Sequence, residues 1–146
     1  MDFRRRILSM HNVGLIEVDG SMSHIFQMNA ALDRGEIVSM TGDRMLGSSK
    51  ALRCTFMGAE ANFPMGPFAL AVQKDVPVVA VFSMRDKWGI YKVYVRKITA
   101  DHGLPARASM QNMAQKFAAE LELMVRRYPT QWFNFYDFWM NADGRA

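Results

Sequence analysis

The spacing of apolar residues over the first 41 positions predicts a strand, a helix and a second strand. Residues 13–18 are a short apolar run bounded by turn residues, which is typical of a strand. A helix should follow, with Ser21 or Ser23 as its N-cap and Gly35 at its C-terminal end. Residues 36–41 then return as a strand, and this order predicts a βαβ crossover in a parallel sheet. The apolar stripe of the helix consists of Met22, Ile25, Phe26, Met28 and Leu32.

The middle of the chain adds three further predicted strands and one segment that continues the first of them. Residues 52–57 alternate as a strand, and residues 58–63 continue as a hairpin partner or an extended edge. Residues 76–82 are apolar and β-branched without alternation, which indicates a central strand covered on both faces. Residues 90–98 alternate more clearly, as expected for a strand nearer the edge of the sheet.

Two helices and an aromatic tail complete the expected fold. Gly66 and Pro67 start one helix, since proline is tolerated in the first turn. Residues 106–127 carry the strongest helical stripe, and Pro129 ends it. In the tail, four aromatics share one helical face. This favours a helix that packs on the core; the alternatives are a base-stacking surface and a membrane-interface belt. These four are Trp132, Phe135, Tyr136 and Trp139.

Composition supports one globular domain, residues 1–146, of the α/β class, with a mostly parallel central sheet flanked by helices and a C-terminal aromatic helix. Half of the residues are apolar and 22% are charged. The net charge of +4 favours anionic partners and leaves lipid headgroups and nucleic acid open. No segment reaches the length of a membrane span. The single cysteine, Cys54, lies in an alternating run, which indicates a strand residue and not a reactive thiol. No zinc-ligand spacing occurs, so no metal is expected.

Two turns have the residue types of an anion site. Asp43 and Arg44 follow an apolar run through Gly42, which places them at the carboxyl end of a predicted strand, where α/β sheets bind ligands. The guanidinium matches a phosphate or carboxylate, but the same pair also fits a contact that only orders a loop. Gly66 and Pro67 precede a helix whose amides would suit an anion, although such turns more often serve only as helix starts.

The three histidines are poor candidates for a general base. A histidine that acts as a general base is usually oriented by a carboxylate. His11 precedes a predicted strand, His102 lies in a Gly/Pro loop, and five residues after His24 stands Asn29 where a carboxylate is wanted. No GxSxG elbow, P-loop or GxGxxG occurs, and no cofactor is expected.

Four ordered blocks resemble the lysophospholipid acyltransferase superfamily, in its lipid A late-acyltransferase branch. They are Gly35-Glu36-Ile37-Val38 leading into Gly42-Asp43-Arg44, Phe63-Pro64-Met65-Gly66-Pro67-Phe68-Ala69-Leu70-Ala71, Val76-Pro77-Val78-Val79, and Tyr128-Pro129-Thr130-Gln131-Trp132-Phe133 with the aromatics after it. The resemblance covers nearly the whole chain. It implies an α/β fold and transfer of a fatty acyl group from an acyl carrier protein or coenzyme A thioester to a lipid or glycolipid hydroxyl.

The resemblance also implies which residues bind the acceptor. Asp43 and Arg44 match the second family block, and Pro64, Gly66 and Pro67 match the third; both blocks are associated with holding the acceptor's anionic group. Two departures weaken the case for glycerol 3-phosphate as the acceptor. Met65 replaces an acidic residue, and Ala80 stands where many relatives have proline.

The family's catalytic HxxxxD or HxxxxE motif does not occur in these 146 residues. Residues 1–18 would align after that motif, so the chain resembles a fragment, a truncated reading frame or a degenerate paralogue, and no catalytic residue is assigned. We expect it to be inactive alone. The expected partners are an acyl carrier protein or acyl-CoA, an anionic lipid or glycolipid acceptor and the cytoplasmic face of the bacterial inner membrane. The alternative is a non-catalytic module that binds anionic lipid or nucleic acid.

Overall fold

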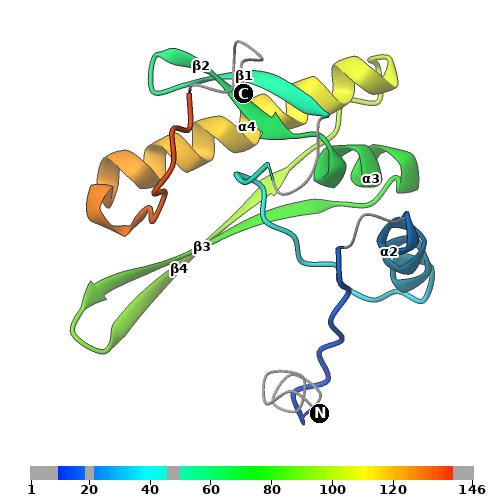
Figure 1. Cartoon of the computed structure of the whole chain (residues 1–146), viewed down its shortest axis with the longest axis horizontal. Helices are drawn as coiled ribbons and strands as arrows, with labels where there is room; N and C mark the ends of the chain where they lie inside the picture. Colours follow the sequence, from blue (N-terminus) through cyan, green and yellow to red (C-terminus); the bar gives the residue numbers. More distant parts are fainter. Residues whose placement is uncertain (1–9, 19–21, 46–49, 140–146) are drawn as a thin grey trace. The chain divides into compact units, whose positions relative to one another are not determined.

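The computed structural model describes residues 10–18, 22–45 and 50–139, which fall into two compact units, Met1–Ser39 and Met40–Ala146 (Figure 1). The described residues form α-helices and two antiparallel two-stranded sheets, so the mixed α/β class is confirmed. That residues 1–146 make a single domain stays a prediction.

The first unit contains α2, Ser23–Asp33. Its end has a Schellman motif, because the Gly35 N–H bonds to the Leu32 carbonyl at 2.9 Å and the Glu36 N–H bonds to that of Ala31 at 3.0 Å. Gly35 has a φ of 76°, which glycine adopts without steric cost. The predicted helix and its C-terminal glycine are therefore confirmed. The residue at the N-cap position is Met22, and Ser21 lies outside the described residues.

Two of the predicted strands do not form. Residues 13–18 and 36–41 have no strand partner among the described residues. A strand needs the backbone of a neighbour to bond to, so an apolar run alone does not make one. The predicted βαβ crossover is therefore wrong for the part of the chain that the structure describes.

The second unit begins with an antiparallel hairpin of β1, Ala51–Phe56, and β2, Ala59–Pro64. Its two-residue turn has positive φ at both Met57 (54°) and Gly58 (85°), which is the pattern of a type I′ turn. The hairpin alternative from the sequence is confirmed.

A longer hairpin joins β3, Val78–Lys87, to β4, Ile90–Ile98, also antiparallel. The mostly parallel sheet is not what these residues form, because two-residue turns join only antiparallel neighbours. The prediction that β3 is covered on both faces is also wrong. Its burial alternates, and Val79 and Val81 remain 51% and 61% exposed.

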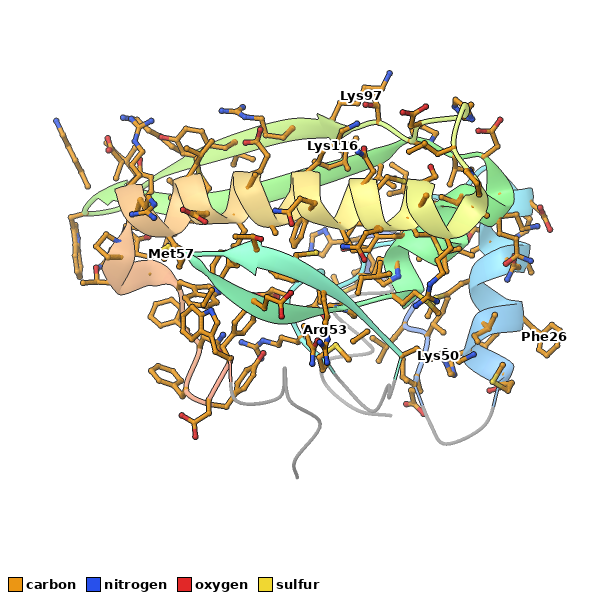
Figure 2. The ribbon with its side chains drawn as sticks, turned by 90° about the horizontal axis from the view of Figure 1, so that it is seen from above. Phe26, Lys50, Arg53, Met57, Lys97 and Lys116 are labelled. Carbon is orange, nitrogen blue, oxygen red and sulfur yellow. The ribbon has the colours of Figure 1, made fainter. Side chains whose placement is uncertain are left out.

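The described part of the second unit contains two α-helices, of which one has both predicted ends and the other begins at the predicted glycine. These are α3, Gly66–Lys74, and α4, Ala106–Arg127, the latter followed by the 3₁₀ turn η1, Pro129–Gln131. Figure 2 shows α4 running between the two hairpins, and α4 contacts both of them as well as α3. Its buried face carries Ser109, Met113, Ala114, Ala118, Leu121, Met124 and Val125.

Side chains of α4 bond to the outer backbone edge of β1. Gln115 both accepts from the Thr55 N–H and donates to the Thr55 carbonyl, each at 2.9 Å. The Glu122 carboxylate accepts the Met57 N–H at 2.7 Å. These bonds occupy an edge that would otherwise be open to another strand.

The aromatic tail packs against this hairpin but is not a helix, so the predicted C-terminal aromatic helix is wrong. Phe138 is 4% exposed, and its ring lies 5.4 Å from that of Phe56 and 5.1 Å from that of Trp132. Phe135, which the helical spacing placed in the core, is 89% exposed. An irregular chain buries its aromatics without helical periodicity, so the spacing argument fails here.

The thiol of Cys54 should react slowly in the folded chain. The residue is 2% exposed, and burial raises the pKa of its thiol to about 11. The reactive thiolate is therefore about a hundredfold scarcer than for an ordinary thiol. We expect labelling by a thiol reagent at neutral pH to be at least about a hundredfold slower in the native chain than in denaturant. Equal rates would show that Cys54 is not a core residue.

Candidate functional site

The turn with Asp43 and Arg44 is attached to the aromatic tail, 89 positions later in the chain. The indole N–H of Trp132 donates to the Asp43 carboxylate at 3.2 Å, and the Tyr136 hydroxyl donates to the Asp43 carbonyl at 3.2 Å. The Arg44 guanidinium donates to the Phe133 carbonyl at 3.3 Å. Asp43 is half-buried and anchors the tail, whereas Arg44 is exposed and donates to the tail from one of its five N–H groups.

The same turn lies against the ring of Phe117 in α4. A Cβ added to Gly42 would stand 2.6 Å from the Phe117 Cζ atom, so no larger residue fits there without displacing the ring. The Phe117 ring also contacts Phe63, at the end of β2, and Phe68, in the first turn of α3, with centroids 6.1 and 6.0 Å apart. One phenyl ring thus lies beside both sequence blocks.

Among the described residues, no side chain caps the start of α3, and none lies within 4 Å of the position that a Gly66 Cβ would occupy. Uncapped amides at a helix start favour anions. Pro64 is buried at the end of β2, whereas Gly66 is exposed and Pro67 is half-buried.

Phe117 therefore lies beside Gly42, Phe63 and Phe68, which are sequence neighbours of the candidate residues, and the candidates themselves differ in exposure. Arg44 and Gly66 face solvent, whereas Asp43 and Pro64 are held in structural contacts. No hydrogen bond joins Arg44 to Gly66 or Pro67 in the part of the chain that is described. Their role in acceptor binding stays a prediction. Sequence reasoning missed Trp132 and Tyr136 as partners of Asp43, because no local spacing connects residues so far apart.

A cavity of about 190 Å³ lies at the other end of α3, away from these residues. Beside it, His102 Nδ1 stands 3.7 Å from an Asp75 carboxylate oxygen, but both side chains are more than three-quarters exposed. Exposed pairs of this kind contribute little energy and poorly orient a base. The cavity is lined by Val72, Asp75, Ala100, Asp101, His102, Leu104, Ala106 and Ser109.

The other histidines gain no orienting carboxylate in the described structure. His24 is half-buried in α2, and the Asn29 amide five residues later donates to the Ile25 carbonyl at 2.8 Å. His11 is exposed. Within the described ranges, no group of three or more His, Cys, Asp or Glu side chains is arranged to hold a metal ion.

Comparison with known protein families gives the site its context. The family described as bacterial lipid A biosynthesis acyltransferase matches residues 3–141 of the chain. The chain belongs to this family. The resemblance inferred from the four sequence blocks is thereby confirmed. Membership of this acyltransferase family implies an acyl donor and a lipid acceptor, without specifying either. No curated protein matches the chain significantly. Among the described residues of this acyltransferase family member, no helix is long and apolar enough to cross a bilayer.

Tyr136 should report on the contact between the tail and the Asp43 turn. Burial, and then the charge of Asp43, raise the pKa of the Tyr136 phenol above 10.0. As the pH rises, the phenol therefore loses its proton at a lower pH in the unfolded chain than in the folded chain. The contribution of Tyr136 to the free energy of unfolding is complete below pH 10 and declines at higher pH. Tyr136→Phe should remove this contribution to the decline in stability at alkaline pH. At neutral pH it should lower the free energy of unfolding by about 0.5–1.5 kcal/mol, because a hydrogen bond is lost.

Urea unfolding of both chains between neutral pH and pH 11 would measure the effect, with the exposed Tyr91→Phe as control. Identical alkaline profiles for wild type and Tyr136→Phe would show that Tyr136 is not packed beside Asp43.

Proposed function

We propose that the chain is the acceptor-handling part of an enzyme that transfers a fatty acyl group from an acyl carrier protein or coenzyme A thioester to a hydroxyl of a lipid or glycolipid. The reaction takes place at the cytoplasmic face of the inner membrane. The observation that supports this most directly is family membership over residues 3–141, together with the grouping of the Gly42 turn and the α3 start around Phe117.

Arg44 binds the anionic group of the acceptor in this proposal. Arg44 is exposed, and its hydrogen bond to the Phe133 carbonyl engages one of the five N–H donors of the guanidinium. Asp43 positions the turn through Trp132 and does not contact the acceptor. The Gly66 and Phe68 N–H groups at the start of α3 supply further donors, since Pro67 has no N–H and the Ala69 N–H bonds to the Met65 carbonyl.

The proton transfer needs a base that these residues do not supply. A histidine paired with a carboxylate, contributed from outside this sequence, removes the acceptor hydroxyl's proton as its oxygen attacks the thioester carbonyl. Collapse of the tetrahedral intermediate breaks the carbon–sulfur bond, and the same proton is returned to the leaving thiolate. The products are the acylated acceptor and a free thiol. Met65 in place of an acidic residue and Ala80 in place of proline argue against glycerol 3-phosphate as the acceptor.

Acyl transfer from a labelled acyl thioester to a lipid acceptor tests the proposal. The 146-residue chain alone should be inactive, and joining an upstream segment with the His/carboxylate motif should give transfer. No transfer by the joined chain with any lipid or glycolipid acceptor would overturn the proposal. Turnover by the chain alone that survives His24→Ala would place the catalytic centre elsewhere.

The role of Arg44 is tested in the joined chain. Arg44→Ala should lower acceptor use by about 10–100-fold, the worth of a charge-assisted hydrogen bond, and Arg44→Lys should recover part of it. Arg107→Ala, at an exposed position in the first turn of α4, is the matched control. Full activity in Arg44→Ala would show that this guanidinium does not bind the acceptor.

A further inference from the structure

The long hairpin of β3 and β4 has one face in the core and the other in solvent. Ala80, Phe82 and Met84 are buried, whereas the alternate positions of β3 are exposed. The register places Val95 opposite Val81 and Val93 opposite Ser83, so these exposed positions share one face. We call this the outer face. Its large side chains are Val79, Val81, Tyr91, Val93 and Val95, each between 51% and 63% exposed.

The tip of this hairpin exposes the bulkiest apolar side chain of the region. Trp88 is 92% exposed and Ile90 is 54% exposed. The tip stands clear of the rest of the second unit in Figure 1, at the lower left. A tryptophan on a projecting turn is not stabilised by burial in the core of its own chain. Contiguous exposed apolar surface of this kind marks an interaction site.

The charge on the hairpin is strongly biased. Val78–Ile98 contains five basic residues and one acidic residue, Asp86, which pairs with Lys92 at 2.9 Å. Arg85 and Lys97 bracket the valines of the outer face, opposite Tyr91 and Val79 in the register. Figure 2 shows Lys97 directed away from α4. The outer face therefore combines aliphatic surface with positive charge and carries no carboxylate.

We propose that the outer face and tip of the β3–β4 hairpin dock on the surface of an anionic lipid bilayer. Tryptophan and tyrosine favour the headgroup level, aliphatic side chains favour the acyl boundary, and basic residues bind anionic headgroups. Trp88 and Tyr91, the valines, and Arg85 with Lys97 supply these three components. The proposal deepens the proposed function, since a lipid acceptor lies in a bilayer.

The same features disfavour two other occupants. A second copy of the chain would bring one positively charged face against another, which like charges oppose. Single-stranded nucleic acid binds aromatic side chains on which its bases stack, whereas four of the five large outer-face side chains are valines. Both occupants remain outcomes of the test.

Sedimentation of the full chain with phosphatidylcholine vesicles, with and without phosphatidylglycerol, tests docking. We expect binding to the anionic vesicles only, weakened at least about tenfold by Trp88→Ser and about fivefold by Arg85→Ser. The controls are Phe135→Ser, which removes a ring that is 89% exposed elsewhere, and Arg107→Ser. Brominated lipid should quench a component of the tryptophan fluorescence that Trp88→Phe lacks.

Equal losses in the hairpin and control variants, or no vesicle binding, would overturn the proposal. Self-association that Trp88→Ser abolishes, in a chain that ignores vesicles, would assign the face to a second copy. Binding to single-stranded DNA with a steep salt dependence, lost in Trp88→Ser, would assign it to nucleic acid. Acyl transfer to a detergent-dispersed acceptor separates this inference from the proposed function, because Trp88→Ser in the joined chain should retain it.

Discussion

Replacing Phe56 with alanine is expected to lower the free energy of unfolding by about 3–5 kcal/mol. The ring is fully buried at the end of β1 and contacts those of Phe63, Trp132 and Phe138, with centroids 5.3–5.8 Å away. Trp139 stacks on it at 5.9 Å and donates its indole N–H to the Phe56 carbonyl. Its removal leaves a cavity between the first hairpin and the aromatic tail.

Urea unfolding measures the loss, and Phe133→Ala is the matched control. Phe133 belongs to the same tail but is 63% exposed, so its truncation should cost less than about 1 kcal/mol. The fluorescence of Trp132 and Trp139 should also shift in Phe56→Ala under native conditions, because both rings lose a packing partner. Similar costs for the two variants would mean that the tail does not pack on β1.

Phe117→Ala should lower the free energy of unfolding by about 3 kcal/mol and loosen both turns of the candidate site. The ring is half-buried and stacks on Phe82 at 6.2 Å as well as contacting Phe63, Phe68 and the Gly42 backbone. One truncation therefore removes a support shared by β2, α3, β3 and the Gly42 turn.

A double-mutant cycle with Gly42→Ala identifies that shared contact. Gly42→Ala alone should cost about 1–3 kcal/mol, because the new methyl group meets the Phe117 ring. The cost should vanish in the Phe117→Ala background, where the obstructing ring is absent. Gly66→Ala, with no atom within 4 Å of its Cβ position, should be close to neutral. Additive effects of Gly42→Ala and Phe117→Ala on the free energy of unfolding would show that Gly42 does not contact Phe117, and so that this ring does not link the two sequence blocks.

The sequence blocks indicated the family, which the family comparison confirms, and named Arg44 and Gly66 as candidates, which stay predictions. Nothing local indicated that Asp43 would bond to Trp132, because that contact joins residues 89 positions apart. It also changes the interpretation of Asp43, from a partner of Arg44 to an anchor for the tail.

Elements whose stabilising signals are local could be predicted from the order of the amino acids. The apolar stripe of α4, the glycine that ends α2 and the proline at the start of α3 each act within a few residues, and these elements form where predicted. The pairing of β3 with β4, the shape of the aromatic tail and the exposed outer face of β3 became known only from the tertiary structure. An apolar run has no preference among distant partners, so whether its side chains are buried depends on what packs against them.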